Sequence, residues 1–69
     1  MIQKTVGLRI KELRNKLNIS QEELADRSNI HRTYIASLEV GKRNVSIVTL
    51  EKIVKALDVS LSEFFDFGE

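Results

Sequence analysis

One stretch of the chain combines hydrogen-bonding and methyl-bearing side chains at the spacing of a single helix face: Arg32, Thr33, Ala36 and Ser37. An arginine can donate two hydrogen bonds to guanine O6 and N7, a serine or threonine hydroxyl can bond several base edges, and methyl groups can contact the thymine methyl. Such a face fits the major groove of duplex DNA. The alternative is an ordinary solvent-exposed helix face.

Polar residues on either side of this stretch are candidates for contact with the DNA backbone. Gln21 lies at the expected first turn of the preceding helix, where amide groups could hold a phosphate oxygen. The alternative for Gln21 is a good helix former at a helix start. A basic connection, Lys42, Arg43 and Asn44, follows the stretch. We expect it to lie over flanking phosphates, with a solvated turn as the alternative.

His31 and Tyr34 each have more than one interpretation. His31 directly precedes an expected helix, so its ring could cap a backbone amide or reach a phosphate. It could also act as a pH switch, because histidine titrates near neutrality. Tyr34 could pack at the edge of the core or place its hydroxyl on a phosphate.

The sequence lacks the residue constellations of enzymes and metal sites. It contains one histidine and no cysteine. It also has no glycine-rich phosphate loop and no pattern with metal-ligand spacing. We therefore expect no catalysis, no metal and no cofactor.

Two short helices joined by a tight turn must position the candidate residues. Ser20 and Glu23 predict a capping box that starts a helix over 21–28, and Asn29 tolerates the left-handed backbone that can end it. A second helix is expected over 32–40. This arrangement is a helix-turn-helix.

The second of these helices has an inward face and a clear stop. Ile35 and Leu38 are expected to face the core, and Gly41 provides a left-handed stop. Arg14 and Glu39 lie beside core positions on two helices that should touch. We expect them to form an ion pair that fastens the second helix of the pair to the first helix of the chain, which makes Arg14 structural.

Three further helices complete an all-α, five-helix fold. They are expected over 4–17, 47–57 and 61–66, the last two behind the capping serines Ser46 and Ser60. The apolar positions of the first are Val6, Ile10, Leu13 and Leu17, and those of the second are Ile47, Leu50, Ile53, Val54 and Leu57.

Length and composition favour a single small domain over residues 1–69. A chain of 69 residues with no cysteine, no proline and three glycines favours helices without disulfides in a reducing compartment. No apolar run approaches the length of a membrane span or of a signal-peptide core, so we expect a cytoplasmic location and no membrane partner. For a DNA-binding protein this location is the nucleoid.

The charge is unevenly distributed along the chain. Residues 1–44 hold nine Lys/Arg and five Asp/Glu, giving +4, and residues 45–69 hold two and five, giving −3, which agrees with the total of +1. A basic first portion favours a polyanion as partner.

The end of the chain is rich in aromatic residues. Phe64, Phe65 and Phe67 lie within four positions. We expect them to contribute an exposed apolar patch, which on a small domain usually marks an interface. The alternative is that they cap the core of the monomer.

These features together resemble the phage-repressor and Cro-like (XRE-type) helix-turn-helix family. The segments that carry the resemblance are residues 10–14, 20–25, 34–35 and 38–41. Residues 32–35, 41–47 and 60–65 are similar, more narrowly, to controller proteins of restriction-modification systems. The sequence departs from the family at Asn29, where glycine is usual, and at His31, which replaces a small or acidic cap.

The resemblance implies a lambda-repressor-like domain that dimerises through its last helix and binds a pseudo-palindromic operator in double-stranded DNA. It implies phosphate contacts for the counterparts of Gln21 and Arg43, and a place in the major groove for those of Arg32, Thr33 and Ser37. It also implies that the counterparts of Arg14 and Glu39 form the buried pair.

Controller proteins activate or repress their own operon, so the resemblance implies control of a restriction-modification operon in a bacterium or phage. Two dimers on adjacent sites, and RNA polymerase as a further partner, are compatible with such a regulator. A different function on the same fold is a protein-interaction module, such as an antitoxin or coactivator, that holds a protein partner with its phenylalanine-rich end.

Overall fold

The computed structural model describes residues 2–67, which form five helices and no strand. The helices are α1 (Ile2–Lys16), α2 (Gln21–Ser28), α3 (Arg32–Glu39), α4 (Ile47–Ala56) and α5 (Leu61–Phe64). The predicted all-α fold is confirmed. Each helix begins and ends within two residues of its expected position.

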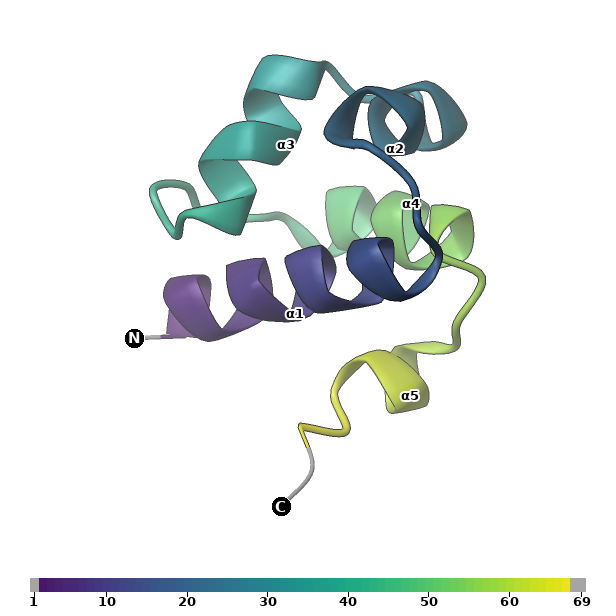
Figure 1. Ribbon diagram of the computed structural model, residues 1–69. Coiled ribbons are helices and arrows are strands. Elements are labelled where there is room, and N and C mark those ends of the chain that lie inside the picture. Colours follow the sequence, from purple (N-terminus) through teal and green to yellow (C-terminus); the bar gives the residue numbers. More distant parts are fainter. Residues whose placement is uncertain (1, 68–69) are drawn as a thin grey trace.

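The helices form a small body in which α3 rests on two neighbours (Figure 1). α3 packs against α1 and α2, α4 packs against α2, and α5 packs against α4. In Figure 1 the α2–α3 pair lies on one side of α1 and α4, and α5 lies on the opposite side. The α2–α3 pair and α5 therefore lie on opposite sides of α1 and α4, although Phe65 lines one hollow together with Leu38 of α3 and with Arg43.

One hydrophobic cluster joins all five helices. Its buried members are Val6, Ile10, Leu13, Ile19, Leu24, Ala25, Ile35, Leu38, Leu50, Ile53, Val54, Leu57 and Phe64. Two expected core positions are wrong, because Leu17 is 41% exposed and Ile47 is 83% exposed. Leu17 follows the last residue of α1 and Ile47 is the first residue of α4, so at both helix ends the apolar stripe no longer faces the core.

Left-handed backbone conformations follow four of the helices. Asn29 has φ 58° and Gly41 has φ 77°, as expected from the sequence. Asn18 and Asp58 adopt the same conformation, with φ 58° and 61°, after α1 and α4. Asparagine and aspartate tolerate this region because their short polar side chains can bond locally.

The capping serines of α2 and α5 differ in whether they complete a capping box. At α5 the box is complete: the Ser60 hydroxyl accepts from the Glu63 amide at 3.0 Å, and the Glu63 carboxylate accepts from the Ser60 amide at 2.9 Å. At α2 only the serine half forms, with Ser20 accepting from the Glu23 amide. The Glu23 carboxylate instead pairs with Arg27 at 2.7 Å, because a cation one turn later on the helix competes for it.

Candidate nucleic-acid interface

The face of α3 that points away from the core carries the four residues predicted to contact bases. Arg32 and Thr33 are exposed, whereas Ala36 and Ser37 are partly buried. The Ser37 hydroxyl donates to the Tyr34 carbonyl at 2.7 Å, so its proton is already engaged within the helix. Arg32 and Thr33 are therefore the members of this set with the most accessible polar groups.

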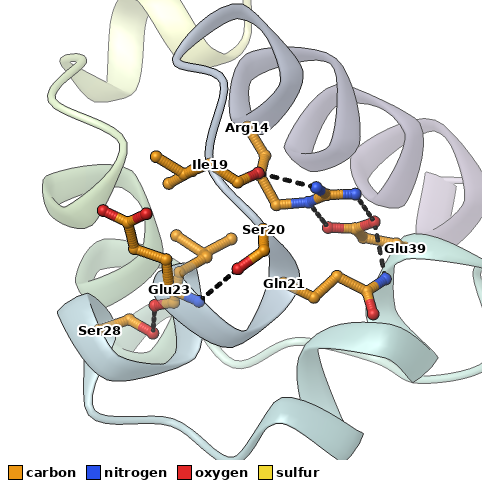
Figure 2. A network of polar contacts seen from close by, with 8 residues as sticks. Arg14, Ile19, Ser20, Gln21, Glu23, Ser28 and Glu39 are labelled. Carbon is orange, nitrogen blue, oxygen red and sulfur yellow. Dashed lines mark hydrogen bonds and ion pairs between the residues drawn. The ribbon is translucent and has the colours of Figure 1, made fainter.

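A network at the C-terminal end of α3 fixes its position (Figure 2). Arg14 donates from Nε to Glu39 Oε2 at 2.7 Å, from Nη2 to Glu39 Oε1 at 3.0 Å and from Nη1 to the Ile19 carbonyl at 2.9 Å. The two side chains are 12% and 2% exposed. The expected ion pair thus joins α1, the turn after it and α3, and its hydrogen bonds raise the pKa of Arg14 above the ordinary value.

Gln21 takes part in the same network. Its Nε2 donates to Glu39 Oε1 at 3.1 Å, so the side chain at the start of α2 contacts the last residue of α3 (Figure 2). This bond gives Gln21 a structural contact that sequence reasoning did not anticipate. Its side chain retains one N–H and an oxygen, so a phosphate contact stays a prediction.

The connection formed by Lys42, Arg43 and Asn44, the basic loop, is tied to two helices. The Arg43 guanidinium lies 5.1 Å from the centre of the Tyr34 ring, and the Tyr34 hydroxyl donates to the Asn44 carbonyl at 3.3 Å. Gln3 Nε2 donates to Asn44 Oδ1 at 2.7 Å. Tyr34 therefore packs beside the core and also holds the loop, and Gln3 is a loop-positioning residue that the sequence did not indicate.

His31 occupies the position before α3 without capping it. Its backbone has the extended conformation of an N-cap, but its side chain makes no capping hydrogen bond. The interpretation of His31 as a side-chain cap is therefore wrong. The ring is exposed beside Arg32, and a phosphate contact stays a prediction.

The aromatic end divides into one core residue and two surface residues. Phe64 is 0% exposed, so its assignment to the interface patch is wrong. It is the fourth residue of α5 and a buried member of the hydrophobic cluster, and Val59, just before the N-cap Ser60, packs against the same cluster. Phe65 and Phe67 are 46% and 40% exposed.

Two residues of α1 position other helices and were missed by sequence reasoning. Gly7 lies against the backbone of α3, where a Cβ would be 2.0 Å from the Leu38 carbonyl oxygen. Arg9 donates to the carbonyls of Glu63 and Phe64 at the end of α5. Neither role has a local sequence signal, since both depend on which helices come together.

Within residues 2–67 no three acidic, histidine or cysteine side chains gather as metal ligands do. Over the same residues, no helix has the length and apolar character needed to cross a bilayer. Two polar clusters of the described chain adjoin α3: the Arg14–Glu39 network and the basic loop with its partners.

A sequence profile described as helix-turn-helix matches residues 10–64. The chain belongs to the helix-turn-helix family. The match includes α2, α3 and α4 completely, and the members of this family are DNA-binding regulators and not enzymes.

Similar proteins within this family belong to one narrower group. The chain is 47% identical over 62 residues to control protein C.BamHI of Bacillus amyloliquefaciens, covering 88% of this chain and 76% of that protein. It is 50% identical over 60 residues to control protein C.MunI of a Mycoplasma species, covering 86% and 81%. These matches confirm the resemblance to controller proteins seen in the sequence.

Solved structures have the same fold. The restriction-modification controller protein C.AhdI of Aeromonas hydrophila superimposes with a TM-score of 0.88 at 41% identity, over 91% of both chains. The controller protein C.Esp1396I, solved as a tetramer with its natural 35 base-pair operator, superimposes with a TM-score of 0.90 at 42% identity, over 94% of this chain and 86% of that one.

Proposed function

We propose that the chain is a homodimeric, sequence-specific regulator of transcription that binds a pseudo-palindromic operator in double-stranded DNA. The observation that carries this proposal is the exposed face of α3, with Arg32 and Thr33 accessible and the basic loop directly beyond its C-terminal end. The face supplies groups for base edges, and the loop supplies cations for flanking phosphates.

The contacts that fix α3 in place support its use for recognising a specific base sequence. The Arg14–Glu39 pair and the Gln21 bond fix its C-terminal end to α1 and α2, and Tyr34 fixes the loop that follows. A helix held this firmly can place its side chains at one register in the groove. In a two-fold dimer the two α3 helices would enter successive major grooves, with half-site centres about 10 base pairs apart.

The relatives support the biological role. C.BamHI, C.MunI and C.AhdI are control or controller proteins, and C.AhdI and C.Esp1396I belong to restriction-modification systems. We propose that this chain likewise controls a restriction-modification operon, acting on cytoplasmic DNA at the nucleoid. Two dimers on adjacent sites are part of the proposal, because C.Esp1396I was solved as a tetramer on its operator. RNA polymerase is the further partner that an activating mode requires.

Selection of bound duplexes from a randomised pool at near-physiological salt tests the proposal. We expect enrichment of an inverted repeat with half-site centres about 10 base pairs apart. A folded protein that enriches no sequence would contradict sequence-specific regulation. Lys52→Ala, which removes a cation on α4, is the control variant and should enrich the same repeat.

A protein-interaction module is the second candidate, favoured by the exposure of Phe65 and Phe67. It predicts weak DNA binding without sequence preference and a tight complex with another protein. The duplex selection separates the two candidates, because only the regulator enriches a repeat.

A further inference from the structure

Arg9 makes an unusual set of contacts between the first helix and the end of the last. Its Nε donates to the Phe64 carbonyl at 2.8 Å, and its Nη2 donates to the Glu63 carbonyl at 2.6 Å. Its Nη1 pairs with Glu12 one turn along α1, also at 2.6 Å. The side chain is only 13% exposed, so this cation is almost enclosed between α1 and α5.

These contacts supply hydrogen-bond donors to the C-terminal end of α5. A helix of four residues is too short to be stable alone. At its end the Leu61 carbonyl accepts from the Phe65 amide and the Glu63 carbonyl accepts from the Asp66 amide at 3.2 Å, and Arg9 adds donors to the Glu63 and Phe64 carbonyls. The capping box of Ser60 and Glu63 closes its N-terminal end. Arg9 closes the other end, because its planar fork supplies two parallel donors to two successive carbonyls.

The exposed aromatic residues begin where Arg9 binds. Phe65 caps α5 and directly follows the Phe64 carbonyl that Arg9 holds. The Phe64, Phe65 and Phe67 rings follow one another edge to face, with centroids 5.1 Å and 6.0 Å apart. Phe67 also lines a shallow groove on α1 together with Leu8, Arg9 and Glu12. The direction of the chain after Phe64, and with it the placement of two exposed rings, therefore depends on Arg9.

We propose that Arg9 is a positioning residue for self-association: by holding the Glu63 and Phe64 carbonyls it presents Phe65 and Phe67 in the orientation that a second copy of this chain binds. The inference rests on the proposed homodimer and names the residue that orients two side chains of its interface. Arg9 is a residue of α1 that contacts α5 and takes no part in the α3 surface, so its effect on self-association is measured without DNA.

A second copy is the occupant that the surface fits. Leu8, which lines the same hollow as Phe67, and Leu61, one helical turn before Phe65, add exposed apolar area, being 56% and 48% exposed. Aromatic residues prefer edge-to-face partners, and a two-fold axis brings the same rings of both copies together. The similar protein C.Esp1396I was solved as a tetramer in complex with its operator, so several copies of this fold come together on DNA in a relative.

Sedimentation equilibrium without DNA tests the proposal on the full chain, with Arg9→Gln and the matched control Lys11→Gln. Both changes remove one cation from α1, but Lys11 is exposed on the helix surface. We expect Arg9→Gln to raise the dimer dissociation constant by about tenfold or more, since two charge-assisted hydrogen bonds are lost. Lys11→Gln should leave that constant within about twofold of the parent value.

Nuclear Overhauser contacts distinguish positioning from a general loss of structure. In Arg9→Gln the Phe67 ring should lose its contacts with Leu8, while Phe64 keeps its contacts with the core. If Arg9→Gln does not fold, Arg9→Lys takes its place, because an ammonium keeps the charge but cannot bond both carbonyls as a fork.

The possible results separate the two proposals. A parent protein that stays monomeric at millimolar concentration would overturn the homodimer itself. A dimeric parent whose dissociation constant is the same in the Arg9 variant, or whose Phe67 contacts persist there, would overturn only the role of Arg9. Loss of dimer together with loss of the Phe64 core contacts would also overturn it, by showing a role in folding alone.

Discussion

Gly7 of α1 and Leu38 of α3 meet backbone to backbone. A Cβ added to Gly7 would lie 2.0 Å from the Leu38 carbonyl oxygen and 3.1 Å from the Glu39 carbonyl carbon. Only glycine permits so close an approach, since the nearest atoms belong to backbone that cannot rotate away. The C-terminal end of α3 therefore rests directly on α1, next to the Arg14–Glu39 pair.

Replacing Gly7 by alanine should reduce stability despite the better helix propensity of alanine. Propensity alone favours alanine by about 1 kcal/mol. The collision with the Leu38 carbonyl should outweigh this gain, and we expect a net loss of about 3 kcal/mol in the free energy of unfolding. Urea denaturation measures the change. Asn15→Ala, at an exposed position of α1, is the control and should be neutral or slightly stabilising; an equally stable Gly7→Ala variant would contradict the close crossing.

Removing one partner of the Arg14–Glu39 pair should lower the free energy of unfolding more than replacing both partners by apolar residues. Arg14→Ala leaves a carboxylate that is 2% exposed and keeps its hydrogen bond from Gln21, and we expect the free energy of unfolding to fall by about 3 to 5 kcal/mol. The double change Arg14→Met with Glu39→Leu should be less damaging, because no buried charge is left unpaired. Urea unfolding of both variants is the measurement. A double variant less stable than the single one would show that the pair itself is strongly stabilising.

The helix ends could be predicted because their signals are local. A capping serine followed by a favourable N3 residue, or an asparagine or glycine at a helix stop, acts within a few positions of the chain. The same local reasoning failed for Glu23, where two local partners compete and Arg27 prevails over Ser20. It also failed for Phe64, because a short helix gives too few turns to determine its inward face.

The roles of Gly7 and Arg9 could not be predicted, since they depend on the packing of helices far apart in sequence. Arg9 contacts residues 54 and 55 positions later. Arg14 and Glu39 were found because both flank core positions on helices expected to touch. The four residues of the α3 face lie on one surface, as helical spacing requires, whereas their contacts with bases stay predictions until DNA binding is measured.

Glu63 should make the start of α5 sensitive to acid. Hydrogen bonds from the Ser60 backbone and side chain hold the pKa of Glu63 below its ordinary value of 4.5. Because the folded-state pKa is the lower one, the contribution to stability is complete above pH 4.5 and is lost as pH falls through the lowered value. A side-chain NMR titration should give a midpoint below the ordinary one. In Ser60→Ala the midpoint should move up toward it, and a normal midpoint in the parent protein would contradict the capping box.

Arg32 should read one base pair in each half-site. In Arg32→Ala, selected operators should lose their preference at a single position, with a cost of about 1 to 3 kcal/mol in binding free energy to the parent operator. Duplex selection and titration at fixed salt measure both effects. Lys52→Ala removes the same charge from α4 and should leave the preference unchanged. An Arg32→Ala variant that still selects the parent base at every position would contradict base readout by this residue.

Arg43 should strengthen binding to every duplex alike. Its guanidinium is exposed in the basic loop and is held over the Tyr34 ring, 5.1 Å from the ring centre, which suits a phosphate contact rather than a base contact. In Arg43→Ala, the slope of log affinity against log salt concentration should fall in magnitude by about one, because one fewer counterion is released. Arg43→Lys keeps the charge and should preserve the slope, although an ammonium stacks less well on the ring. Since the Tyr34 hydroxyl still holds the Asn44 carbonyl in both variants, the loop keeps its position. A loss confined to one operator sequence, with the salt slope unchanged, would instead make Arg43 a base-reading residue.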